Sequence, residues 1–187
     1  ARRPGVPAIA GRGRRQRQAW LRGWEAVVAR QLRHWPALDA RERSDLGELV
    51  EWFVTKKRFE PARGFELTQE VVLTVGAHAG LLVLGLGPDA LSDVRTVVVH
   101  PRTITQRGER ATTIRGVVAD GPRRVLGHTS SRRGPVVLSW ASVRADLARP
   151  GAGHNVVLHE LAHKLDAADG LFDGTPELLD ASLREEW

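Results

Sequence analysis

The sequence contains no cysteine. Without thiols the chain cannot form disulfides, thiolate zinc sites, iron–sulfur clusters or a cysteine nucleophile, so any metal must be bound by histidine, aspartate or glutamate. Methionine is also absent and the chain begins at Ala1, so we expect a trimmed product or a fragment. Its 187 residues, 42% of them apolar, suit one globular domain, or a small domain with a helical annex, better than two separate cores.

The sequence also lacks an apolar stretch of membrane-spanning length. Residues 71–84 are apolar almost throughout, but a bilayer crossing needs about 20 apolar residues, and this shorter run contains Gly76, His78 and Gly80. We therefore predict a buried helix within residues 65–86 and no membrane segment. In such a helix His78 is expected to be a hydrogen-bonded core residue rather than a ligand.

Lysine is scarce, because three of the 28 basic residues are lysine and the other 25 are arginine. We interpret this bias as the coding preference of a GC-rich genome, so the net charge of +6 is weak support for nucleic-acid binding. No apolar signal segment follows the N-terminal arginines. We predict a basic, partly flexible extension over residues 1–38, with contact to RNA, DNA or an acidic partner as the alternative, and a folded domain over residues 39–187. Seven arginines crowd the first 22 residues: Arg2, Arg3, Arg12, Arg14, Arg15, Arg17 and Arg22.

Helical periodicity is strong between Asp39 and Lys57, so the sequence predicts an amphipathic helix there. Asp39 can cap its start, and Lys56 and Lys57 lie in its last turn, where the helix dipole favours cations. Its apolar positions recur at i, i+3, i+4, i+7 and i+8: Leu46, Leu49, Val50, Phe53 and Val54.

A two-residue period replaces the helical one between Asp93 and Trp140. It predicts a strand around 94–98 that ends at His100-Pro101, with further extended segments at 115–119 and 134–140. The last segment has a proline at its second position, which suits a strand start or a sheet edge. We take it as the candidate edge strand, to which an extended substrate could pair. Helices before and after these strands indicate an α+β fold.

The chemistry concentrates in His159-Glu160-Leu161-Ala162-His163, an H-E-x-x-H pattern. An apolar stripe of Leu158, Leu161, Ala162 and Leu165 places the pattern on an amphipathic helix, which we expect to end at Gly170. On a helix the two histidines are one turn apart, so both imidazoles can reach one tetrahedral zinc ion.

Glu160 follows His159 by about 100° around the helix, beside the metal rather than on it. That position suits a general base, which takes a proton from zinc-bound water as it attacks a peptide carbonyl and returns it to the leaving amine. Asp166, three residues after His163, either orients a liganding histidine or is a solvated aspartate in the last turn.

Several segments together resemble the MtfA family, over roughly residues 40–187. They are Phe65-Glu-Leu-Thr68, Gly134-Pro-Val-Val-Leu-Ser-Trp140, Asn155-Val-Val-Leu-His-Glu-Leu-Ala-His-Lys-Leu-Asp166 and Asp173-Gly-Thr-Pro176, in this order. The resemblance implies a zincin-like metallopeptidase core, a cytoplasmic bacterial enzyme with aminopeptidase activity, and Zn²⁺ as the cofactor. It places the metal ligands on His159 and His163 and the catalytic glutamate on Glu160.

The family's third ligand is a glutamate on a later helix, and no glutamate of this chain is assigned to that role. We therefore expect that the C-terminal part of the peptidase is missing and that this chain binds zinc poorly. The resemblance also implies an alternative function, in which the protein binds and titrates a transcriptional repressor such as Mlc. We therefore expect a peptide substrate, a possible repressor partner and no membrane, with nucleic acid as the least favoured partner.

Overall fold

The computed structural model describes residues 23–102 and 134–167 in full, and between them the backbone of five short strands. Its helices are α2 (Trp24–Gln31), α3 (Ala40–Lys56), α4 (Gln69–Leu82), α5 (Trp140–Leu147) and α6 (Val156–Asp166), with 3-10 turns η2 (Trp35–Ala37) and η3 (Pro88–Leu91). Its strands are β1 (Arg58–Pro61), β2 (Thr96–His100), β3 (Ile104–Gln106), β4 (Arg110–Ala111), β5 (Val118–Ala119), β6 (Arg123–Val125), β7 (Gly127–Thr129) and β8 (Val136–Ser139).

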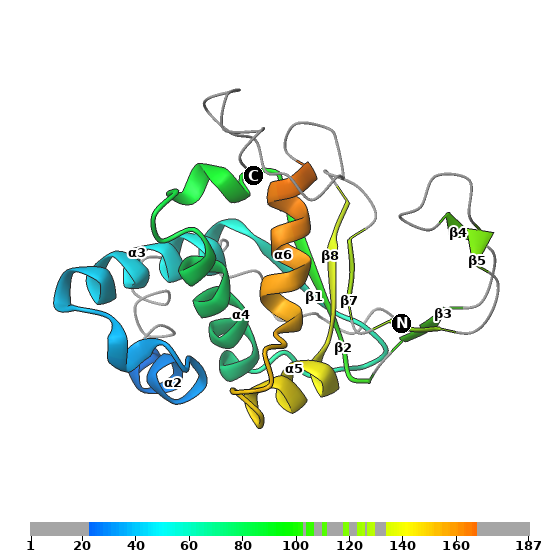
Figure 1. Cartoon of the computed structure of the whole chain (residues 1–187), viewed down its shortest axis with the longest axis horizontal. Coiled ribbons are helices and arrows are strands. Elements are labelled where there is room, and N and C mark those ends of the chain that lie inside the picture. Colours follow the sequence, from blue (N-terminus) through cyan, green and yellow to red (C-terminus); the bar gives the residue numbers. More distant parts are fainter. Residues whose placement is uncertain are drawn as a thin grey trace.

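The main sheet has the strand order β1-β2-β8-β7. The first three strands are parallel, and β7 pairs antiparallel with β8. In Figure 1, α6 runs alongside β8 and β7, and α4 and α3 lie beyond α6. The pairs β3–β6 and β4–β5 form two small antiparallel ribbons, which in Figure 1 lie on the side of the main sheet opposite α3 and α4. The α+β class is confirmed.

The predicted helix over residues 39–57 is confirmed as α3. Asp39 accepts a hydrogen bond from the backbone N–H of Glu42 at 2.8 Å, and the Glu42 side chain accepts one from the N–H of Asp39 at 2.8 Å, which makes a capping box. Leu46 and Val50 of its apolar face are fully buried.

The apolar stretch after residue 65 is the buried helix α4, as predicted. Two of its glycines permit a close approach to α3, because a Cβ on Gly76 would lie 2.8 Å from Val54 Cγ1 and one on Gly80 would lie 2.8 Å from Leu46 Cδ1. No helix within residues 23–102 and 134–167 combines the length and apolar character that crossing a bilayer requires.

Two apolar clusters lie around α3 and α4. One joins these helices to the sheet and to α6, through Val99, Leu138 and Leu161 among others. The second packs α2 onto α3 and α4 and buries Val28 and Leu32. Val28 and Leu32 belong to residues 1–38, the segment that we predicted to be a partly flexible extension. The domain boundary at residue 38 stays a prediction, since residues 1–22 lie outside the described residues.

One strand prediction is wrong in its position. The segment 134–140 does contain a strand, β8, but β8 lies between β2 and β7 instead of at the edge. Pro135 precedes the hydrogen-bonded residues, so it takes no ladder bond away. Among the described strands, β7 is the edge strand on the side of α6.

Candidate metal centre

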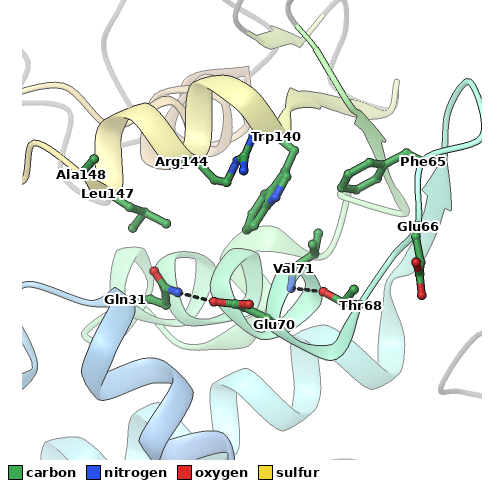
Figure 2. Close-up of a pocket in the computed structure, with 10 residues that line it drawn as sticks. All are labelled: Gln31, Phe65, Glu66, Thr68, Glu70, Val71, Trp140, Arg144, Leu147 and Ala148. Atoms are coloured by element: carbon green, nitrogen blue, oxygen red, sulfur yellow. Dashed lines mark hydrogen bonds between the residues drawn. The ribbon is translucent and has the colours of Figure 1, made fainter.

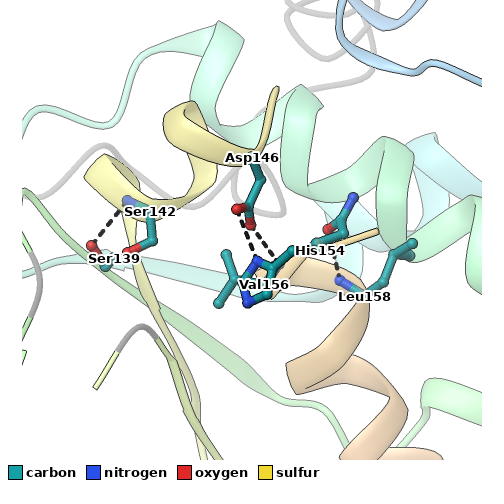
Figure 3. Close-up of polar contacts among 7 residues, drawn as sticks. Ser139, Ser142, Asp146, His154, Val156 and Leu158 are labelled. Atoms are coloured by element: carbon teal, nitrogen blue, oxygen red, sulfur yellow. Dashed lines mark hydrogen bonds and ion pairs between the residues drawn. The ribbon is translucent and has the colours of Figure 1, made fainter. Parts of the chain in front are cut away.

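Helix α6 begins at a polar junction with α5. Asn155 caps it by accepting a hydrogen bond from the N–H of Leu158 at 3.1 Å. Asp146 of α5 accepts another from the N–H of Val156 at 2.8 Å, and its other oxygen lies 2.9 Å from Nδ1 of His154 (Figure 3). Side chains of Asn155 and Asp146 therefore satisfy two of the backbone N–H groups in the first turn of α6.

The two histidines of the H-E-x-x-H pattern face each other. The Nε2 atoms of His159 and His163 are 3.2 Å apart, close to the roughly 3.3 Å that separates two nitrogens each about 2.0–2.1 Å from a tetrahedral zinc ion. His159 is exposed and His163 is half-buried, so the pair opens to solvent. The donor set and its spacing fit a zinc ion.

Glu160 lies on a different face of α6 from the histidines. It is 5% exposed and shares the buried face with Leu161 and Lys164. A carboxylate buried to this extent requires polar or cationic partners.

The ammonium group of Lys164 is one cation close to this carboxylate. Its Nζ donates a hydrogen bond to the carbonyl oxygen of Gly134 at 2.7 Å, and the side chain is 3% exposed. Burial lowers the pKa of Lys164 below its ordinary value, while the negative charges of Asp93 and Glu160 act in the opposite direction.

A third metal ligand does not come from the part of the chain that the structure describes. Among those residues, no three histidine, aspartate or glutamate side chains form a group that could hold a metal. Asp166 is half-buried in the last turn of α6, and its role toward a histidine stays a prediction. The expected helix stop at Gly170 falls outside the described residues.

His78 is the other histidine that the sequence singled out. It is 3% exposed within α4, and its Nδ1 lies 2.8 Å from the carbonyl oxygen of Thr74. Burial lowers its pKa below the ordinary value, an effect that the Thr74 carbonyl partly opposes. The predicted core histidine is confirmed.

A separate pocket of about 530 Å³ lies between α5 and the start of α4 (Figure 2). Phe65 and Trp140 provide aromatic walls, and Glu66 and Arg144 provide opposite charges at its rim. None of residues 159–163 lines it. The pocket is thus distinct from the histidine pair.

Sequence reasoning missed the roles of Asp146 and Lys164. The hydrogen bond from the N–H of Val156 to Asp146 joins α6 to α5 across a loop, and no local sequence pattern predicts it. For Lys164 the sequence did hold a signal. The chain has 25 arginines and three lysines, and one of these lysines directly follows the H-E-x-x-H pattern.

Comparison with known proteins identifies relatives of the chain. A family model described as glucose-regulated metallo-peptidase M90 matches residues 10–187. An uncharacterized protein of Synechocystis is 33% identical over 156 residues, which are 83% of this chain and 56% of that protein.

Other relatives carry the name Mlc titration factor A. The protein of Escherichia fergusonii is 33% identical over 147 residues, covering 79% of this chain and 53% of the relative. That of Enterobacter is 32% identical over 134 residues, covering 72% and 49%. The chain thus spans about half the length of the curated relatives it matches.

Proposed function

Because the chain belongs to the glucose-regulated metallo-peptidase M90 family, the family of the Mlc titration factor A proteins, we propose that it forms the metal-binding part of a zinc-dependent, aminopeptidase-like metallopeptidase. The observation that carries the proposal is the 3.2 Å separation of the Nε2 atoms of His159 and His163. Two imidazoles at one turn of a helix, with a glutamate between them, make the donor set of this chemistry.

The roles of the three residues follow from their places on α6. His159 and His163 would hold the zinc ion. When bound, zinc supplies Lewis acidity, which acidifies water and polarises a peptide carbonyl. Glu160 would accept the proton of the attacking water and pass it to the leaving amine.

Glu160 needs a change of rotamer or an opening of its surroundings for this role, since it is 5% exposed. Its buried position keeps the carboxylate beside a cation, Lys164, and away from bulk water. A general base held in a poorly hydrated site takes its proton from the attacking water instead of exchanging it with bulk solvent.

The arrangement of α6 and the sheet supports a zincin-like core. Helix α6 packs against β7 and β8, and β7 is the edge strand beside it. An extended peptide can add to such an edge through main-chain hydrogen bonds, which would place its carbonyls next to the metal-binding turn. We expect β7, rather than β8, to receive the substrate.

A catalytic zinc ion usually has three protein ligands and one open position. Two are present in α6, and we expect the third to lie outside the residues that the structure describes. A natural gene product that supplies a further carboxylate should bind zinc more tightly than the 187-residue chain. Isothermal titration of both forms measures this difference, and equal affinities would contradict it.

The test of the activity uses the natural gene product and amino-acid p-nitroanilides as substrates. Glu160→Gln should lower kcat by about 10²–10⁴-fold, the usual contribution of a general base, and should leave zinc affinity within about threefold because Glu160 is not a ligand. His163→Ala should lower both activity and zinc affinity. Full cleavage by the Glu160→Gln protein would remove Glu160 from the mechanism.

A second function is favoured by the name of several relatives, Mlc titration factor A. In this alternative the protein binds a transcriptional repressor, and the peptidase site is regulated by that binding or is independent of it. Repressor binding by the Glu160→Gln protein, with cleavage lost, would show that the two roles are separate. We further propose that the protein acts in the cytoplasm, where both functions would meet their substrates.

A further inference from the structure

Two of the three lysines in this chain are buried. Lys57 is 5% exposed and Lys164 is 3% exposed, whereas Lys56 lies at the surface. Lysine is among the residues that are almost never fully buried without partners, because removing an ammonium group from water is costly. The structure supplies partners for both buried lysines, and one of those of Lys164, Glu160, belongs to the H-E-x-x-H pattern.

The hydrogen bond of Lys164 joins two elements that are far apart in the sequence. Its Nζ donates to the carbonyl oxygen of Gly134 at 2.7 Å, across 30 residues. Gly134 comes just before β8, the strand that lies beside β2 and β7 in the main sheet. The hydrogen bond therefore connects the last turn of α6 to the residue just before the inner strand β8.

The charge of Lys164 matters as well as its length. Glu160 precedes it by four residues, so the two side chains lie one turn apart on the same buried face, in the order that stabilises a helix. Asp93, in the loop before β2, also attracts the ammonium group. Removal of the cation would leave the carboxylate of Glu160 buried with less compensation, which costs more than the pair contributes.

Arginine would not substitute for this residue. The ammonium group is a compact charge with three donors, while the guanidinium is a wide planar fork that needs more room. The chain uses 25 arginines and three lysines. A buried lysine whose ammonium group donates to the carbonyl oxygen of Gly134 fits the geometry of the smaller group.

We propose that Lys164 is a positioning residue for the metal centre, which its ammonium group holds in place by binding the Gly134 carbonyl and balancing the charge of Glu160. The proposal rests on the proposed function, since it assigns Lys164 a part in that site. Lys164 follows His163 directly, so a loosened last turn of α6 moves one histidine relative to the other. The 3.2 Å separation of the two Nε2 atoms depends on that turn.

The absence of cysteine allows a test that changes the charge without changing the shape. Lys164→Cys introduces a single thiol, which is alkylated in urea with bromoethylamine or with bromopropane before refolding. The first reagent restores a side chain of lysine length with an ammonium group, and the second gives a neutral side chain of the same length. Wild-type chain carried through the same steps, and Lys56→Cys alkylated in the same two ways, are the controls.

The first readout is amide hydrogen exchange, which needs no metal. In the neutral form we expect the amides of α6 to exchange about tenfold faster or more, while those of α3 keep their rates. The second readout is Co²⁺ affinity from its visible absorption, which should fall about tenfold in the neutral form. The aminoethylated form should return to within about threefold of wild type in both. Lys164→Met, produced directly in cells, repeats the neutral arm without refolding.

Wild-type exchange in α6 and wild-type Co²⁺ affinity in the neutral forms would overturn the proposal, and so would failure of the aminoethyl group to restore them. A different result identifies failure of the proposed function. If wild-type chain binds no Co²⁺ while exchange in α6 still depends on the ammonium group, the positioning of α6 by Lys164 stands and the metal site does not.

Discussion

The Nε2 atoms of His159 and His163 lie 3.2 Å apart, with the two ring planes at 75° and the ring centroids 4.5 Å from each other. Two nitrogens this close have one productive common partner, a cation or a shared proton, because like lone pairs repel. The helix sets the spacing of the two Cα atoms, and the caps at Asn155 and Asp146 fix where the helix begins. The pair is thus built by the first three turns of α6.

Loss of either histidine should remove the chelate. We expect His163→Ala to lower the affinity for Zn²⁺ by about 100-fold or more, since one imidazole and water replace two protein ligands. The control is His34→Ala, which removes an exposed histidine beside η2 at the other end of the described chain and should leave the affinity within about threefold. Competition with a chromogenic chelator measures both. Equal losses in the two variants would mean that zinc binds to histidines without selection.

The contact between α3 and α4 yields a prediction on stability. A Cβ on Gly76 would lie 2.8 Å from Cγ1 of Val54, whose branched side chain has little rotamer freedom within α3. Overpacking of this kind costs about 1–3 kcal/mol, and alanine recovers roughly 1 kcal/mol through its helix propensity. We expect Gly76→Ala to lower the free energy of unfolding, as measured by urea denaturation.

Gly85 offers the matched control. A Cβ there would meet no atom within 4 Å, so Gly85→Ala should leave the denaturation midpoint close to that of wild type. If both substitutions have the same effect, the close packing of α3 and α4 at Gly76 is not the cause.

Local patterns were sufficient for α3 and α6. In each, apolar residues at helical spacing mark the element, and the predicted cap of α3, Asp39, is present. Such signals are local, so a sequence shows them without knowledge of the rest of the fold. The pairing of His159 with His163 follows from the same local geometry.

Contacts between distant segments were not predictable in this way. The place of β8 inside the sheet was missed, although Val136, Val137 and Leu138 form the continuous apolar run that is typical of an inner parallel strand. Strand β1 was missed because its four residues, two of them charged and one a proline, do not form the β-branched or aromatic run that marks a strand. The bond from Lys164 to Gly134 spans 30 residues and depends on the packing of α6 on the sheet.

The buried His78 predicts a loss of stability in acid. Burial lowers its pKa in the folded protein, so between that lowered value and the ordinary 6.5 the unfolded chain binds more protons than the folded one. Stability contributed by the neutral ring is therefore lost as the pH falls below 6.5. His78→Leu should flatten this part of the stability profile, as measured by urea denaturation between pH 7 and pH 5. An unchanged slope would contradict the assignment.

The alkaline side of the profile depends on a second buried base, Lys57. Its Nζ donates to the carbonyl oxygen of Leu91 at 2.7 Å and lies 4.2 Å from the ring centroid of Trp52. Burial lowers its pKa from 10.5 to about 8, and the attraction of Asp93 opposes part of that shift. The charged form is thus less favourable in the folded protein than in the unfolded chain.

Between pH 8 and pH 10.5 the unfolded chain then binds more protons at Lys57 than the folded protein does, so the free energy of unfolding should rise with pH across this range. The range is open to measurement because the chain has no tyrosine or cysteine, and arginine keeps its proton. Urea denaturation at several pH values should show the rise in wild type and in Lys56→Met, the exposed control, and a smaller rise in Lys57→Met. A stability that falls with pH in wild type, or an equal rise in all three proteins, would show that Lys57 is ordinarily charged in the folded state.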